Sequence, residues 1–187
     1  MKITDGEKLI LLMLSELYEK LEINGEIEPK FIREAIFSNN LWALPWKYSG
    51  IPFENQEDPE IVKEVMDILE MWSFIEYSYG QLSKEDKEYL EKEAAPFGKD
   101  PKFPGFDGNN ESEYMGTASF IVNELERFEK FKGRNFNSHC FSIDEYKRML
   151  SVFKNIRVKC GYGPMLAVDL ATILKERIHP SNRRISE

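Results

Sequence analysis

The chain has 187 residues, of which 42% are hydrophobic and 31% are charged, and its formal net charge is −8. Such a chain forms one compact domain, with or without a small appendage, and is too apolar to be disordered throughout. No apolar run approaches the roughly 18 residues of a membrane span, and the first residues do not resemble a secretory signal. The acidic balance argues against a dedicated nucleic-acid coat protein. The two cysteines, Cys140 and Cys160, cannot form a disulfide framework, so we expect a cytoplasmic protein. No membrane partner is expected, because no apolar run is long enough to span a bilayer.

The first predicted helix follows Thr4. Thr4 and Glu7 have the spacing of a capping box, in which each side chain satisfies a free backbone N–H of the other residue. Behind them, apolar residues recur every three or four positions, as in an amphipathic helix that ends near Asn24: Leu9, Ile10, Met13, Leu17 and Leu21. A second, short helix is predicted to begin at Pro29, because proline is favoured at the first helical position.

Residues 41–53 are rich in aromatic side chains and are interrupted by proline and glycine. This density of proline and glycine prevents a long helix, so we expect a loop with at most one helical turn. Such a segment either forms an interaction surface or covers an open end of the core, and the sequence leaves both interpretations open. The candidate contact residues are Trp42, Trp46, Tyr48 and Phe53.

The strongest helical signal follows Asp58, which is the expected cap. Apolar side chains at residues 61–75 occupy a broad face, which is typical of a central helix contacted on more than one side. Residues 83–93 are rich in lysine and glutamate and predict a solvated surface helix. Residues 96–109 contain three prolines and three glycines, and are therefore expected to be irregular.

Four further features are predicted in the second half of the chain. A helix is expected over about residues 111–132, ending before a glycine. Ser142 and Glu145 repeat the capping-box spacing at the start of the next helix. Pro164 is the expected start of the last helix, and residues 179–187 are expected to form a flexible tail.

No segment alternates apolar and polar residues with a period of two, so the sequence predicts an all-α fold. The expected architecture is a compact bundle of about six or seven helices joined by long irregular loops. Residues 1–187 would form a single domain, within which residues 1–57 would be a helical N-terminal subdomain.

Three segments of this chain resemble the YfbU family of bacterial proteins: residues 66–79, 103–131 and 136–153. The most specific part is the string G-F-D-G-N-x-E-x-x-Y, which begins at Gly105. The resemblance covers most of residues 58–156, and the first helix is similar to the opening segment of the family more weakly. It implies an all-helical, cytoplasmic bacterial protein of no settled biochemical activity.

The first candidate site lies within residues 103–111. Glycines there permit a tight turn, and Asp107, Asn109 or Asn110 can cap the helix that follows. Alternatively, oxygen atoms of Asp107, Asn109 and Glu111 can bind a ligand, loosely as in a calcium loop, although a complete loop of that kind needs about 12 residues. We favour the turn, and expect no metal site. No phosphate-binding or dinucleotide-binding glycine pattern occurs, so no cofactor is expected either.

The second candidate site is the segment from Arg134 to His139. These two residues have the spacing of the Arg-x4-His motif of the HEPN superfamily of helical ribonucleases, which cleave RNA without a metal. Such chemistry would use the histidine to move a proton and the guanidinium to hold a phosphate. A surface loop is the simpler interpretation. A third possibility is a small-ligand site where this loop meets residues 103–111, formed by Asp107, Asn109, Glu111, Asn137, Ser138 and His139.

The favoured function is that of a non-enzymatic helical protein that acts through protein–protein interaction or self-association, with residues 41–53 as the contact surface. A homodimer or other homo-oligomer is expected, because apolar residues occupy several helix faces. The first alternative is a metal-independent ribonuclease or toxin that uses Arg134 and His139, and only this alternative implies RNA as a partner. The second alternative is a regulatory protein that binds a small ligand.

Overall fold

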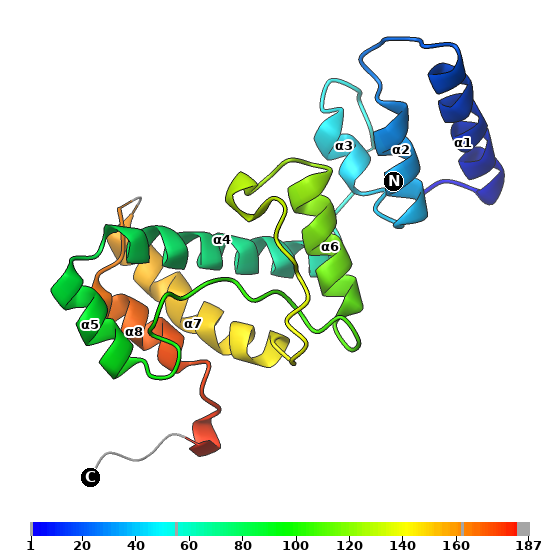
Figure 1. Ribbon diagram of the computed structural model, residues 1–187. Coiled ribbons are helices and arrows are strands. Elements are labelled where there is room, and N and C mark those ends of the chain that lie inside the picture. Colours follow the sequence, from blue (N-terminus) through cyan, green and yellow to red (C-terminus); the bar gives the residue numbers. More distant parts are fainter. Residues whose placement is uncertain (1, 55, 162, 183–187) are drawn as a thin grey trace.

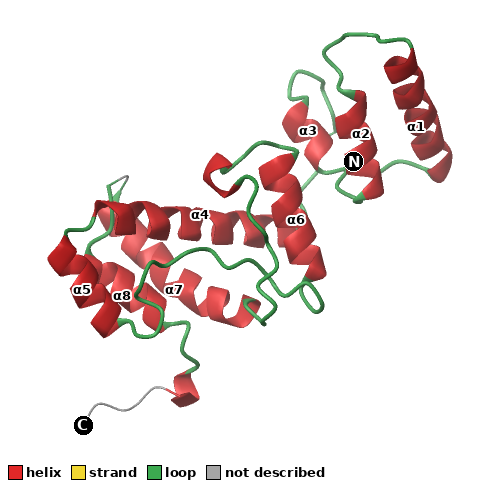
Figure 2. Cartoon of the chain, in the orientation of Figure 1, coloured by secondary structure: helices red, strands yellow, loops and turns green. Residues whose placement is uncertain are grey.

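The computed structural model describes residues 2–54, 56–161 and 163–182 (Figure 1). Among these residues the regular secondary structure consists of eight α-helices and two short 3-10 helices (Figure 2). The described ranges contain no strand, and a single β-bridge joins Phe106 to Asn137. The all-α prediction is therefore confirmed. Of the tail expected at residues 179–187, Pro180–Asn182 form the 3-10 helix η2, and residues 183–187 lie outside the described part.

The first three helices lie together at one end of the molecule (Figure 1). They are α1 (Asp5–Lys20), α2 (Pro29–Phe37) and α3 (Ala43–Lys47). The capping box before α1 is confirmed, since the Thr4 N–H donates to the Glu7 carboxylate at 2.7 Å and the Glu7 N–H donates to the Thr4 hydroxyl at 3.2 Å. The five-residue α3 is the short helical segment expected within residues 41–53, and it brings the α-helices to eight.

The main bundle is built around α4 (Glu60–Gln81), which α6 (Ser112–Asn123), α7 (Ile143–Cys160) and α8 (Ala167–Lys175) contact. The charged α5 (Lys84–Glu93) packs on α8, with Leu90 as its buried residue. The predicted broad apolar face of α4 is confirmed, because its side chains are buried along the length of the helix: Val62, Val65, Ile68, Leu69, Met71, Trp72 and Ile75. None of the described helices has both the length and the hydropathy of a membrane span.

The predicted cap of α4 and the predicted first residue of α8 are wrong. Asp58 does not cap α4; its carboxylate instead accepts a hydrogen bond from the indole N–H of Trp46 at 3.1 Å. Pro164 does not begin α8, because the chain first passes through an extended segment that buries Met165. The Met165 N–H donates to the Ser78 hydroxyl of α4 at 2.9 Å, and this contact holds the segment outside the helix.

The sequence predicted one helix over about residues 111–132, but α6 is shorter and ends at Asn123. The chain then turns through Glu126 and Phe128, which both have a φ of 53°, before the 3-10 helix η1 (Glu129–Phe131). This turn directs Phe131 into the core, where its ring lies 5.4 Å from that of Phe103. Burial of a large aromatic side chain therefore outweighs the local preference for a continuous helix.

Candidate functional site

The two loops that carry the candidate polar residues lie side by side. The Phe106 N–H donates to the Phe136 carbonyl at 2.8 Å, and the Ser138 N–H donates to the Phe106 carbonyl at 2.8 Å. Residues 103–111 and 134–141 thus form a short two-stranded contact within an otherwise helical fold. We call this region the loop junction.

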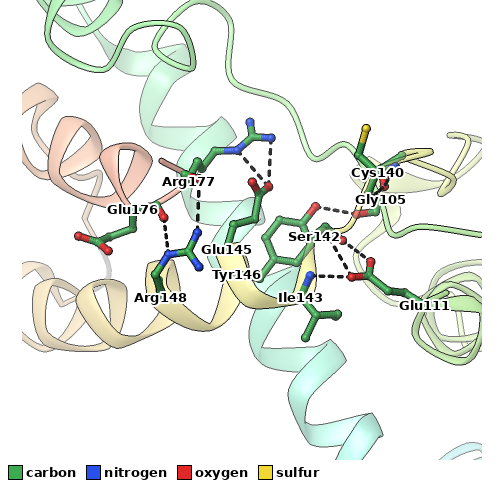
Figure 3. A network of polar contacts seen from close by, with 11 residues as sticks. Gly105, Glu111, Cys140, Ser142, Ile143, Glu145, Tyr146, Arg148, Glu176 and Arg177 are labelled. Atoms are coloured by element: carbon green, nitrogen blue, oxygen red, sulfur yellow. Dashed lines mark hydrogen bonds and ion pairs between the residues drawn. The ribbon is translucent and has the colours of Figure 1, made fainter. Parts of the chain in front are cut away.

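Gly105 is what allows the loops to approach each other so closely. Its φ is +92°, and a Cβ atom at this position would lie 2.1 Å from the carbonyl oxygen of Phe136. The hydroxyl of Tyr146 in α7 donates to the Gly105 carbonyl at 2.6 Å (Figure 3). The junction is therefore anchored to the buried face of α7, and only glycine fits at its closest point.

Glu111 is the polar centre of the junction. Its carboxylate accepts hydrogen bonds from the Asp107 N–H at 2.9 Å, the Ser142 N–H at 2.8 Å and the Ile143 N–H at 2.9 Å. It also accepts one from the Ser142 hydroxyl at 2.6 Å (Figure 3). Since two of these N–H groups belong to the start of α7, Glu111 caps that helix from a distant part of the chain.

The capping box predicted at Ser142 is therefore wrong. The Ser142 side chain makes no capping hydrogen bond to its own helix. Glu145, the expected second member of the box, instead pairs with Arg177 at 3.1 Å. Nearby, the Arg148 guanidinium donates to the Glu176 carbonyl (Figure 3). A buried carboxylate at the helix start satisfies the N–H groups that the hydroxyl would otherwise have served.

The charge of Glu111 is stabilised by its surroundings. Burial acts to raise the pKa of this carboxyl, but the hydrogen bonds from Ser142, Asp107 and Ile143 together outweigh burial and hold the pKa below its ordinary value. Glu111 is consequently ionised at neutral pH, and its oxygen atoms are already occupied by the protein's own donors. This arrangement suits a structural carboxylate better than a proton-transferring one.

Asp107 and its neighbours form a turn rather than a cap. The Asp107 carboxylate accepts hydrogen bonds from the Asn110 side-chain amide at 2.6 Å and from the Asn109 N–H at 3.1 Å. These bonds, with a smaller contribution from the charge of His139, lower the pKa of Asp107. No side chain caps α6. Within the described ranges, no three His, Cys, Asp or Glu side chains are grouped as metal ligands.

The predicted residues of the second loop are also engaged locally. The Asn137 side-chain oxygen accepts from the Gly108 N–H and from the His139 N–H, both at 3.0 Å. The Ser138 hydroxyl donates to the Cys140 carbonyl at 2.7 Å. The structure therefore brings the two loops together as the small-ligand hypothesis requires, but it uses their polar groups to hold the loops to each other.

Arg134 and His139 have different neighbours. Arg134 forms a two-pronged pair with Glu76 of α4, with N–O distances of 2.7 and 2.9 Å, and its guanidinium lies 5.0 Å from the centre of the Phe131 ring. Burial acts to raise the pKa of Glu76, but Arg134 and the Phe103 N–H outweigh it and lower the pKa.

His139 is exposed, has a φ of 55°, and is near enough to Asp107 to influence the pKa of that carboxyl.

The aromatic segment is half-buried rather than free. Trp42 packs against both apolar clusters of the molecule, with its ring 5.1 Å from that of Trp46 and 6.1 Å from that of Phe120 in α6. The Arg127 guanidinium lies 4.6 Å from the centre of the Trp46 ring. Tyr48 and Phe53 are likewise partly buried. These side chains join the N-terminal helices to the main bundle, and the segment borders a hollow of about 430 Å³.

The apolar stripe predicted on the first helix is present, but it faces solvent. The side chains along this face, which we call the outer face of α1, are between 46% and 67% exposed: Leu9, Ile10, Met13, Leu14, Leu17 and Leu21. The buried residue of α1 is Ser15, whose hydroxyl donates to the Leu11 carbonyl at 2.8 Å. Leu11 and Leu12 are partly buried beside Ser15, so α1 already packs one side on the protein and leaves a second apolar face uncovered.

Comparison with known proteins identifies the family. A model of the YfbU domain matches residues 1–175. The chain belongs to the YfbU family. A UPF0304 protein of Methanocaldococcus jannaschii is 31% identical over 96 residues, which cover 49% of this chain and 54% of that relative. The chain thus matches about half the length of this curated relative. The YfbU match includes both the loop junction and α1.

Sequence reasoning missed the exposed face of this YfbU chain, although one signal was present. Residues 9–14 are six consecutive apolar residues, so they spread over more of the helix circumference than packing on a single neighbour can cover. Beside this face, an apolar groove of about 340 Å³ runs between α1, α2 and the aromatic segment. Its walls include the following side chains: Ile10, Leu11, Ile27, Ile32, Leu44 and Phe53.

Proposed function

We propose that this member of the YfbU family is a non-enzymatic, cytoplasmic bacterial protein that acts through protein–protein interaction, and that the outer face of α1 is its main contact surface. The observation that carries the proposal is the exposure of Leu9, Met13 and Leu17 on a helix whose inner side buries a serine. Contiguous apolar patches of this kind on soluble proteins mark interaction sites. Ile51 and Phe53 of the aromatic segment line the apolar groove beside this face.

The state of the polar candidates supports the same proposal. Arg134 is paired with Glu76, and Glu111 accepts four hydrogen bonds from the protein itself. A catalytic group must instead be free to reach a substrate. The polar loop junction therefore acts as a scaffold for α7.

Site-specific photo-cross-linking tests the proposal. A photoreactive amino acid would replace Leu17 on α1 or, as a control, Val158 on α7, which is 85% exposed. We expect a defined cross-linked product in cells with the Leu17 probe, no defined product with the Val158 probe, and loss of the Leu17 product when Met13→Glu is added. Equal labelling from both positions, or no product from Leu17, would contradict the proposal.

A further inference from the structure

The outer face of α1 has the spacing of a helix-pairing seam. Ile10 and Leu17 are seven residues apart, and so are Leu14 and Leu21, which is the heptad spacing of two helices that pack along their length. The helix that packs most extensively on α1 is α2; Ile10 and Leu14 border the grooves between these two helices, and α1 stands at the outer edge of the molecule (Figure 1). The seam is thus suited to a second helix from outside the described chain.

The seam also has approximate two-fold symmetry. Ile10 and Leu17 lie at equal distances on either side of the point between Met13 and Leu14. About the same point, Leu21 corresponds to Gly6, where a Cβ atom would meet no heavy atom nearer than 4.0 Å. In an antiparallel pair, Leu21 of one copy would fill the space over Gly6 of the other. A parallel pair would instead place Leu21 against Leu21 and leave the two glycines facing each other.

The charges at the two ends of α1 also favour antiparallel pairing. The first turn of α1 contains Asp5 and Glu7, followed by Lys8, and its last turn contains Glu19 and Lys20. About the point between Met13 and Leu14, antiparallel pairing sets Glu7 opposite Lys20 and Lys8 opposite Glu19, and Asp5 alone meets a like charge, Glu22. The helix dipoles then oppose each other. Parallel pairing would set the two acidic turns side by side.

The area of the face is close to what a dimer requires. Six adjacent aliphatic side chains, each about half exposed or more, form a patch on the order of 600 Å², at the upper limit of what a monomer exposes. A stable interface buries about 800 Å² on each partner. The rim of the neighbouring apolar groove would supply part of the remainder.

We propose that the occupant of the outer face of α1 is the same face of a second copy of this chain, with the two α1 helices antiparallel about a two-fold axis near Met13 and Leu14. This inference rests on the proposed function and adds the identity and the geometry of the partner. A two-fold arrangement closes on itself, because each patch is covered by its own copy, and it therefore yields a dimer rather than a filament.

Cysteine cross-linking of the full chain distinguishes the two directions. In a background with Cys140→Ser and Cys160→Ser, Met13→Cys lies near the axis and is expected to form a disulfide-linked dimer on oxidation. Leu21→Cys alone should not form one, because two such residues would be about 22 Å apart in an antiparallel pair, well beyond disulfide range. A mixture of Leu21→Cys and Gly6→Cys chains should form a mixed dimer. Cross-linking of Leu21→Cys to itself would overturn the antiparallel geometry.

The mass in solution tests the pairing itself. Light scattering or sedimentation of the wild-type chain at about 100 μM should give a dimer, provided that the Kd is micromolar or tighter. Met13→Glu and Leu17→Glu should each raise the Kd by about 100-fold, because a charge would be buried at the seam, whereas Val158→Glu should leave the dimer unchanged. Circular dichroism would verify that each variant keeps its helicity.

Two results would overturn self-pairing: a monomeric wild-type chain, or a dimer that survives both glutamate substitutions on α1. The photo-cross-linking experiment separates this failure from failure of the proposed function. A monomeric chain whose Leu17 probe still captures a different protein through α1 would refute the dimer and leave the interaction surface intact. Absence of any Leu17 product would remove both.

Discussion

Glu111 and Ser142 are 31 residues apart in the chain, yet the Glu111 carboxylate accepts both the backbone N–H and the hydroxyl of Ser142, at 2.8 and 2.6 Å. This contact ties the start of α6 to the start of α7. It also fixes the two loops of the junction, because Glu111 holds the Asp107 N–H at the same time. A single buried carboxylate thus joins two helices and a turn.

Removing the charge of Glu111 should destabilise the whole domain. Glu111→Gln keeps the shape of the side chain but replaces one acceptor oxygen with a donor that faces N–H groups. We expect the free energy of unfolding to fall by about 2–4 kcal/mol. Urea denaturation followed by circular dichroism measures this change. Glu113→Gln, on an exposed residue of the first turn of α6, is the matched control and should change stability by less than about 0.5 kcal/mol. Equal effects of the two substitutions would contradict the structural role.

The same carboxylate should make stability depend on acid. The pKa values of Glu111 and Glu76 are both lowered in the folded protein, relative to an ordinary value of 4.5. As the pH falls below about 5, the unfolded chain therefore binds more protons than the folded one at these sites, and stability declines. Glu145 works in the opposite direction, because burial raises its pKa despite the neighbouring Arg177.

Comparison of wild type with Glu111→Gln isolates the contribution of this one group. Unfolding free energies measured between about pH 7 and pH 3 should fall less steeply in the variant than in the wild type. The stability that Glu111 contributes is fully present above its unfolded pKa and is lost as the pH passes down through its folded pKa. Parallel curves for the two proteins would show that Glu111 is not linked to acid unfolding.

Thr4 and Ser142 show what the sequence can and cannot predict. Both are followed three residues later by glutamate, and the pattern alone predicts a capping box at each. At Thr4, which is exposed at one end of the molecule, the local pattern decides the structure. At Ser142, a carboxylate from a distant loop competes for the same N–H groups and wins. Helix types and most helix starts were thus predictable, whereas contacts between distant segments were not.

In the candidate sites, too, local features were predictable from the sequence and contacts between distant segments were not. Sequence reasoning found both loops of the junction, because glycine and short polar residues have strong local preferences. It did not find Glu76 as the partner of Arg134, since that pair spans 58 residues. Nor did it foresee that the stripe of α1 faces outward, because periodicity shows that a helix has an apolar face without showing which neighbour covers it.

Two glycines provide a paired test of the loop junction. Gly105→Ala places a Cβ atom 2.1 Å from the Phe136 carbonyl oxygen at a φ of +92°, so we expect a loss of at least about 3 kcal/mol of stability. Gly116→Ala, in the exposed side of α6, meets no heavy atom within 4 Å and should stabilise the protein by up to about 1 kcal/mol. Thermal unfolding of both variants measures the contrast. A tolerated Gly105→Ala would show that the loops can separate.

The Arg134–Glu76 pair predicts a coupling that can be measured. The Glu76 side chain is 6% exposed, so Arg134→Gln leaves a buried carboxylate without its partner. We expect a loss of about 2–4 kcal/mol, and a smaller loss for Arg134→Lys, which keeps the charge but cannot form both hydrogen bonds. A double-mutant cycle with Glu76→Gln should give a coupling energy of about 1–3 kcal/mol. Additive effects would mean that the pair contributes nothing specific.

RNA cleavage separates this structural role from the ribonuclease alternative. Under the proposed function, the purified chain without added metal should leave RNA intact at neutral pH. Cleavage by the wild type that is lost in both His139→Ala and Arg134→Lys, with helicity retained, would favour the ribonuclease instead. His139→Ala is the decisive variant, because His139 is exposed and its removal should cost less than about 0.5 kcal/mol of stability. Because the fold does not depend on the imidazole, a loss of cleavage in this variant would show that His139 takes part in the reaction.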